Sequence, residues 1–327
     1  MDWKNTKVLV TGAGGFIGSH LTERLAGLGA VTRALVQYNS RGHCGWLEHS
    51  PSRNQIEIIA GDVRDAGSVR QAMREVDVVF HLAALIAIPY SYQAPNSYVE
   101  TNIIGTLNVL QAAREMGTAR VLHTSTSEVY GTARQVPIPE SHPLQGQSPY
   151  SASKIGADKL AESFHLSFGV PVVTVRPFNT FGPRQSARAV IPSIITQALA
   201  GQAVKLGNLT PTRDLNFVAN TVDGFLAAAA APAAIGQTIN FGSGREISIG
   251  DLASLIGKLM DCPLSVVQDD QRLRPEKSEV ERLLADNTLA RTILGWEPRV
   301  TLEAGLTQTI AWLRANQDKY RPEAYAV

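Results

Sequence analysis

Tyr150 and Lys154, four residues apart, are the two side chains of this sequence best suited to acid–base chemistry. In a helix this spacing places the phenol and the ammonium on one face. A free tyrosine titrates near pH ~10, and a neighbouring ammonium lowers that pKa because it stabilises the phenolate. The pair therefore predicts proton removal from an alcohol whose carbon loses a hydride, with Tyr150 as the base.

Three hydroxyls and a carboxylate lie upstream of this pair, in the run Ser125, Thr126, Ser127 and Glu128, just after a predicted strand. A hydroxyl at Thr126 can share the substrate's hydrogen bond with Tyr150, and Ser127 stands next to it. Glu128 adds a second acid–base group. The alternative role for Glu128 is structural, as a carboxylate that caps nearby backbone N–H groups.

A glycine-rich loop precedes all of these residues. Gly12, Gly15 and Gly18 follow an apolar run at residues 8–11 and open a predicted helix, in the spacing GxxGxxG, with Phe16 and Ile17 between the last two. Glycines let the backbone turn sharply and approach a pyrophosphate, to which the helix presents free N–H groups. We therefore expect this loop to bind NAD or NADP, whose nicotinamide ribose Lys154 would also hold.

Further cofactor contacts are expected at the ends of the next strands. The second strand ends in Val36 and Gln37 without the usual ribose-binding carboxylate, and Arg41 follows, which favours NADP slightly over NAD. Asp62 and Val63 are placed to contact adenine, although Asp62 can equally cap a helix. The fourth strand ends in Leu82, Ala83 and Ala84, and the small side chains of the two alanines would let the dinucleotide lie close to the backbone.

The elements that position these groups alternate between strand and helix over the first two thirds of the chain. The predicted strands are 7–11, 31–36, 56–60, 76–83, 120–124 and 170–176, and the predicted helices are 19–28, 68–75, 97–116 and 149–168. This alternation predicts an α/β fold, a Rossmann-type doubly wound parallel sheet. We expect residues 1–177 to form the dinucleotide-binding domain, with returns near 214–242, and 178–327 a smaller substrate-binding domain.

The composition excludes several classes of protein. The 327 residues carry a net charge of +1 and 44% hydrophobic residues, so no affinity for nucleic acid or membranes is expected. The two cysteines, Cys44 and Cys262, form no CxxC pair, and the seven histidines are scattered, so we expect no metal. No signal peptide is evident, and a cytoplasmic location is expected.

Five motifs occur in the order found in the extended short-chain dehydrogenase/reductases that modify nucleotide sugars, and this resemblance runs over nearly the whole chain. They are the glycine loop, residues 81–84, residues 125–131, the Tyr150–Lys154 pair and residues 176–179. Residues 142–154, 184–192, 212–217 and 274–279 more narrowly resemble the 4,6-dehydratases of legionaminic- and pseudaminic-acid pathways. Those enzymes act on UDP- or GDP-linked N-acetylglucosamine.

Glu128 separates the reactions that this resemblance allows. A 4-epimerase needs only hydride removal and return at C4, whereas a 4,6-dehydratase must also remove the C5 proton and expel the C6 hydroxyl. Thr126-Ser127-Glu128 resembles the dehydratase pattern, in which Glu128 would serve at both C5 and C6. The same triplet occurs in UDP-glucuronate decarboxylases, so epimerase and decarboxylase remain alternatives. A non-catalytic dinucleotide-sensing regulator is the alternative from another class.

The resemblance also implies substrate contacts and an assembly. The residues expected to contact the nucleotide sugar are Pro89, Tyr90, Asn179, Arg184, Arg213 and Arg274. Fixed arginines suit a diphosphate because each offers a bidentate fork. For Arg188, in the same polar loop as Arg184, we expect a surface salt bridge instead. The helices at 97–116 and 149–168 form the dimer bundle in relatives, which predicts a homodimer.

Overall fold

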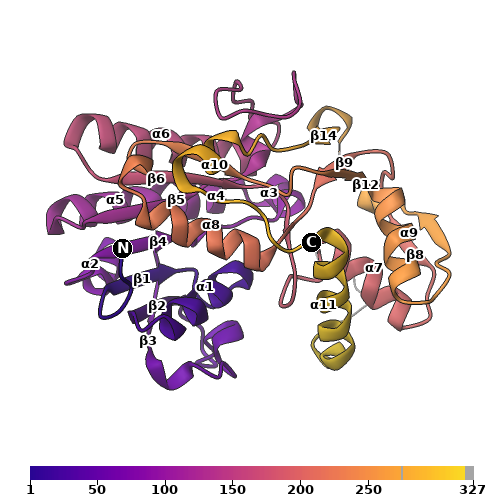
Figure 1. Cartoon of the computed structure of the whole chain (residues 1–327), viewed down its shortest axis with the longest axis horizontal. Coiled ribbons are helices and arrows are strands. Elements are labelled where there is room, and N and C mark those ends of the chain that lie inside the picture. Colours follow the sequence, from indigo (N-terminus) through magenta and orange to yellow (C-terminus); the bar gives the residue numbers. More distant parts are fainter. Residues whose placement is uncertain (274, 321–327) are drawn as a thin grey trace.

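A parallel sheet of seven strands forms the centre of the computed structural model, which describes residues 1–273 and 275–320 (Figure 1). The strands stand in the order β11-β6-β5-β4-β1-β2-β3. They are β1 (Lys7–Thr11), β2 (Val31–Gln37), β3 (Ile56–Gly61), β4 (Val78–His81), β5 (Arg120–Thr124), β6 (Val172–Pro177) and β11 (Thr238–Phe241). This order, with its reversal between β1 and β4, confirms the predicted doubly wound fold.

Helices cover both faces of the sheet (Figure 1). One face carries α1 (Phe16–Gly27) and α8 (Val218–Ala230), and the other carries α2 (Ala66–Met73), α5 (Gly105–Met116) and α6 (Pro149–Phe168). Along β1, Val8 and Val10 pack into the first of these cores and Leu9 into the second. Because both faces are buried, the strands are nearly continuous apolar runs rather than alternating ones.

The helix that carries the Tyr–Lys pair has sharply defined ends. Ser148 and Ser151 form a capping box at its start, and Pro149 occupies the first helical turn, where a missing N–H costs nothing. Gly169, with φ 69°, ends the helix in the left-handed conformation. These local signals explain why the sequence predicts α6 with the bounds that the structure shows.

The helix predicted at residues 97–116 is divided. A short α4 (Pro95–Tyr98) is followed by a π-helical segment over Val99–Ile104, and only then by α5. π-helical turns interrupt regular helices and are frequent at functional sites. Asn102 lies in this turn and contacts the loop after β4, as described below.

The C-terminal part forms a smaller lobe beside the sheet (Figure 1). Its elements are α7 (Val190–Leu199), β8 (Val204–Leu206), β9 (Thr212–Asp214), β12 (Glu246–Ser248), α9 (Ile249–Leu259), β13 (Val266–Gln268), β14 (Arg282–Leu283) and α11 (Leu302–Ala315). Between them, α8 and β11 return to the main sheet, and α10 (Thr288–Leu294) packs beside them. In the described part of the chain no helix has the length and apolarity needed to cross a bilayer.

Candidate active site

A cavity of about 1360 Å³ lies between the carboxyl ends of the sheet strands and the C-terminal lobe. Its walls include the loops that follow β1, β4, β5 and β6. Open α/β sheets bind ligands at this edge, where the strand order reverses. The volume exceeds the ~300–1,000 Å³ usual for one small ligand, so the cavity has room for two.

The glycine loop forms a cradle that side chains would fill. A Cβ on Gly12, whose φ is +68°, would lie 2.8 Å from the backbone nitrogen of Ala83, and one on Gly18 would lie 2.2 Å from the carbonyl oxygen of Gly12. Phe16 and Ile17, at the start of α1, also line the cavity. The bare backbone and the helix N-terminus together suit a dinucleotide pyrophosphate, so these residues fit the cofactor that the sequence predicts.

Gly18→Ala should weaken dinucleotide binding about ten- to hundredfold, because relieving the contact with Gly12 costs about 1–3 kcal/mol. Gly27→Ala is the matched control, since it lies in the same helix and a Cβ added there would meet no atom within 4 Å. Titration of the two variants with NADH, followed by nicotinamide fluorescence, measures the difference. Equal affinities would show that the loop does not approach the pyrophosphate.

At the adenosine end, the segment after β2 folds onto the glycine loop. The backbone N–H of Trp46 donates to the carbonyl of Gly14 at 2.9 Å, and Gly45 has the positive φ that this approach requires. Asn39 and His43 line the cavity here. Arg41, which favoured NADP in the sequence, is exposed and does not line the cavity.

The predicted adenine contacts also lie outside the lining. The Asp62 carboxylate accepts hydrogen bonds from the guanidinium of Arg64, at 2.6 Å to Nη2, and this interaction is the first of the causes that lower the pKa of Asp62. Val63 is buried in the core beneath. Leu82, Ala83 and Ala84, by contrast, line the cavity directly opposite the glycine cradle.

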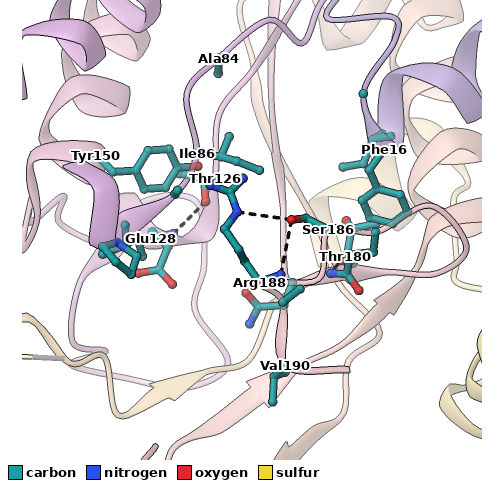
Figure 2. Close-up of a pocket in the computed structure, with 18 of the residues that line it drawn as sticks. Phe16, Ala84, Ile86, Thr126, Glu128, Tyr150, Thr180, Ser186, Arg188 and Val190 are labelled. Atoms are coloured by element: carbon teal, nitrogen blue, oxygen red, sulfur yellow. Dashed lines mark hydrogen bonds between the residues drawn. The ribbon is translucent and has the colours of Figure 1, made fainter. Parts of the chain in front are cut away.

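Tyr150 lies in the cavity wall with its ring edge-to-face against Tyr98, 6.3 Å between centroids (Figure 2). Burial raises the pKa of its phenol well above the usual range, whereas a hydrogen bond with Thr126 lowers it and the charge of Glu128 raises it. Lys154, from which we expected a lowering of this pKa, is not among the groups that shift it. The positive charge of a bound, oxidised nicotinamide would favour the phenolate.

Lys154 lines the same cavity as Tyr150, and its Nζ donates to the carbonyl of Thr124 at 2.6 Å. Burial lowers the pKa of Lys154 to about 8, and the charge of Asp158, one turn further along α6, raises it. Asp158 is itself held by His123 (2.9 Å) and Arg176 (2.9 Å), in an almost fully buried network. The carboxylate therefore helps to keep the lysine protonated.

Asp158→Asn should shift the alkaline limb of the pH–kcat/KM profile to lower pH. Catalysis requires protonated Lys154 and is lost as pH rises through its pKa. Removing the charge of Asp158, which raises this pKa, leaves burial unopposed, so the loss begins at lower pH. Glu162→Gln, an exposed carboxylate on the same helix, is the control. An alkaline limb that does not move would contradict the electrostatic role of Asp158.

Glu128 and Ser127 enter the same wall from a short 3-10 helix, Ser127–Tyr130, directly after β5. Thr126 caps this helix by accepting a hydrogen bond from the backbone N–H of Glu128 at 3.2 Å. Figure 2 shows Thr126, Glu128 and Tyr150 on one side of the cavity. A phenol, a hydroxyl and a carboxylate thus line one side of the same chamber.

Two residues that support this chamber were not found from the sequence. Asn102 bridges the loop after β4 and α6, because its Nδ2 donates to the carbonyl of Leu85 and to Oγ of Ser153, both at 2.9 Å. Asp158 is the other. Both are polar residues at apolar helical positions, and that mismatch was the available signal: Asp158 continues the i, i+4 series of Tyr150 and Lys154.

The candidate substrate contacts fall into two groups. Pro89, Asn179 and Arg213 line the cavity. Asn179 has a buried Nδ2 without a hydrogen-bond partner among the described residues, a donor that a ligand oxygen would satisfy. Arg213 forms an ion pair with Glu279 at 3.0 Å.

The residues of the second group are not among those that line the cavity in the described structure. Arg184 does not line the cavity, because Glu23 and Ser19 on α1 hold its guanidinium at 3.0 and 3.1 Å. Tyr90 packs against Tyr98 and does not line the cavity, whereas Tyr92 does. Arg274 lies outside the described residues.

Arg188 corrects an expectation in the other direction. We expected it in a surface salt bridge. It is exposed, but it forms no ion pair within the described part of the chain, and it lines the cavity. Figure 2 shows its side chain extending into the pocket.

Residues 1–273 and 275–320 contain no cluster of three metal-ligating side chains.

Comparison with known proteins places this fold and site among the extended short-chain dehydrogenase/reductases that modify nucleotide sugars. Residues 9–309 match the model of the GDP-mannose 4,6-dehydratase family, and the chain belongs to this family. A UDP-glucose 4-epimerase from Mycolicibacterium smegmatis is 34% identical over 315 residues, which are 94% of this chain and 98% of the relative. A dTDP-glucose 4,6-dehydratase from Actinoplanes sp. is 33% identical, over 95% and 98% of the two chains.

Two further relatives extend the range of reactions and ligands. UDP-glucuronic acid decarboxylase 1 from Xenopus tropicalis is 34% identical, over 94% of this chain and 72% of the relative. Among solved structures, the dTDP-glucose 4,6-dehydratase DesIV from Streptomyces venezuelae, with NAD bound, superposes with a TM-score of 0.87 at 30% identity, over 97% and 99% of the chains. The protein is therefore an enzyme of the NAD-dependent nucleotide-sugar dehydratase and epimerase family.

Proposed function

We propose that the protein is a nucleotide-sugar 4,6-dehydratase that converts UDP- or GDP-N-acetylglucosamine to its 4-keto-6-deoxy derivative. The similar proteins include epimerases, dehydratases and a decarboxylase, so similarity alone does not choose among them. The observation that carries the proposal is Glu128, a carboxylate in the same chamber as Tyr150 and Thr126. Epimerisation has no step for this group.

The chain's own residues would divide the reaction as follows. The nicotinamide of a bound dinucleotide would supply the redox chemistry, as hydride acceptor for C4 and hydride donor for C6. Tyr150 takes the C4 hydroxyl proton, with Thr126 sharing the hydrogen bond and Lys154 holding positive charge below it. The C4 ketone acidifies C5, so Glu128 can remove the C5 proton and deliver it to the departing C6 hydroxyl, which leaves as water. Hydride return to C6 then requires a proton at C5, which balances the proton that Tyr150 took from the C4 hydroxyl.

We further propose the surrounding contacts. Asn179 and Arg213 would bind the diphosphate, and the lobe of residues 178–327 would supply the rest of the nucleotide site. NAD is the better proposal for the cofactor, because Arg41 lies away from the lining and a solved relative contains NAD. The exposed apolar residues Val99, Ile104, Leu166 and Phe168 lie on the helices expected to form a homodimer.

The test is incubation of the enzyme with UDP- and GDP-N-acetylglucosamine, UDP-glucose and UDP-glucuronate, read by mass spectrometry. The proposal expects an N-acetylglucosamine product lighter by one water, with no net reduction of the cofactor. A C4 epimer of unchanged mass would show that the protein is an epimerase instead. Release of carbon dioxide from UDP-glucuronate would show that it is a decarboxylase. Cofactor binding without any turnover would favour the regulator.

A further inference from the structure

Arg188 differs from the other cavity arginines in having no carboxylate partner in the described chain. Arg213 is paired with Glu279 and Arg272 with Asp269. Among residues 1–273 and 275–320, Arg188 donates hydrogen bonds to the hydroxyl of Ser186, from Nε at 3.3 Å and from its backbone N–H at 3.4 Å. A cation that lines a cavity and forms no ion pair within the described residues is suited to a ligand that supplies acceptor oxygens.

The loop around Arg188 is fastened on both sides. Arg184 ties it to α1 through Glu23, and the hydroxyl of Tyr320 donates to the carbonyl of Gln185 at 2.8 Å. Ser186 then orients the Arg188 side chain toward the interior (Figure 2). The loop that carries Arg188 is thus held in place before a ligand binds, which reduces the entropy lost on binding.

The guanidinium lies at the redox end of the cavity. Its charge lies close enough to Tyr98 to lower the pKa of that phenol, although burial raises the pKa overall. Tyr98 packs edge-to-face on Tyr150, and its hydroxyl donates to the carbonyl of Ala87 in the cavity wall. The arginine therefore lies on the same side of the cavity as Tyr150, the group proposed to act at C4 of the hexose.

The wall beside it favours a strong acceptor over another hydroxyl. Ile86, Ala87, Ile88 and Pro89 line this end and are apolar. Arg188 is an exposed residue in this structure, and a hexose bound between it and this wall would take its guanidinium out of water. A carbonyl or carboxylate oxygen that accepts its hydrogen bonds offsets that cost. The apolar wall alone would suit a wholly neutral group, but Arg188 adds a positive charge to the same chamber.

We propose that Arg188 is a specificity residue, which binds a carbonyl or carboxylate oxygen on the hexose of the nucleotide sugar. In the proposed substrate this oxygen belongs to the N-acetyl group. This inference rests on one part of the proposed function, namely that the hexose of the nucleotide sugar binds in the chamber beside Tyr150.

The test compares Arg188→Ala with the unchanged residue in a Tyr150→Phe background, which blocks turnover. Calorimetric titration of the holoenzyme uses UDP, UDP-glucose, UDP-N-acetylglucosamine and UDP-glucuronate, with the guanosine compounds in parallel. We expect Arg188→Ala to weaken binding of the N-acetylated sugar about tenfold or more and to leave UDP and UDP-glucose unchanged. Arg24→Ala, an exposed arginine on α1, is the control.

The remaining outcomes separate this inference from the proposed function. A loss confined to UDP-glucuronate would support the role of Arg188 and contradict N-acetylglucosamine as the substrate. An equal loss for UDP would show that Arg188 contacts the diphosphate, and no loss for any compound would show that it contacts nothing. Either result overturns the inference.

Discussion

Glu128→Gln is expected to reduce dehydration about 10²–10⁴-fold, the range that positioned acid–base groups contribute. Glutamine keeps the size and hydrogen-bonding ability of the side chain but cannot take the C5 proton. Oxidation at C4 does not need this proton, so Tyr150 still acts. We therefore expect reduced nicotinamide to accumulate in the variant, whereas it is only transient in the unchanged enzyme.

Two measurements separate this loss from a general loss of structure. Exchange of the C5 proton with solvent deuterium should disappear, while binding of the substrate and NADH stays close to that of the unchanged enzyme. Glu162→Gln, which changes an exposed carboxylate on α6, should retain both dehydration and C5 exchange. Persistent C5 exchange in Glu128→Gln would assign the base to another residue.

Tyr150→Phe is expected to block the reaction one step earlier, with a loss of similar or greater size, about 10²–10⁴-fold or more. Phenylalanine keeps the ring against Tyr98, which preserves the packing of the cavity wall. Without the phenol, the C4 hydroxyl has no base in the Tyr–Thr–Lys group. Reduced nicotinamide should then not appear, even transiently.

The two variants thus have opposite spectroscopic signatures on the same substrate. Stopped-flow absorbance of the reduced cofactor distinguishes them directly, and substrate affinity by calorimetry shows that both still bind. If Tyr150→Phe still reduced the cofactor at an undiminished rate, Tyr150 would not be the base. If both variants behaved alike, the division of roles between C4 and C5 would be wrong.

The parts of this molecule that depend on local sequence were predictable. β1 and α6 have the predicted bounds because an apolar run, a serine cap and a terminal glycine fix them within a few residues. The glycine loop lies where β1 meets α1 for the same reason. The π-helical turn at Val99–Ile104 was not predictable, because it reflects the tertiary fit of Asn102 against the loop after β4.

The roles of the arginines depended on partners far away in sequence. Arg184 and Arg188 lie in one polar loop, and the sequence assigns the first to the substrate and the second to the surface. Glu23 on α1, distant in sequence, instead binds the guanidinium of Arg184 and holds it away from the cavity. Arg188 has no such partner in the described chain and turns into the cavity.

The pKa values of the Tyr–Lys pair also depend on residues that are distant in sequence, and they could not be predicted from its spacing. Helical spacing places Tyr150 and Lys154 together, but burial determines their pKa values, which it raises for the phenol and lowers for the ammonium. Burial depends on Tyr98, on β5 and on the network around Asp158, which come from separate segments. Spacing therefore identifies the pair, and only the fold shows how it is tuned.

The most direct test of the proposed dehydration follows the hydrogen at C4. Nucleotide-linked N-acetylglucosamine that carries deuterium at C4 is incubated with the enzyme, and the product is analysed by mass spectrometry and NMR. Dehydration through Tyr150 and Glu128 predicts a product lighter by one water with the deuterium at C6. Deuterium that remains at C4 of an epimer of unchanged mass would contradict the central claim.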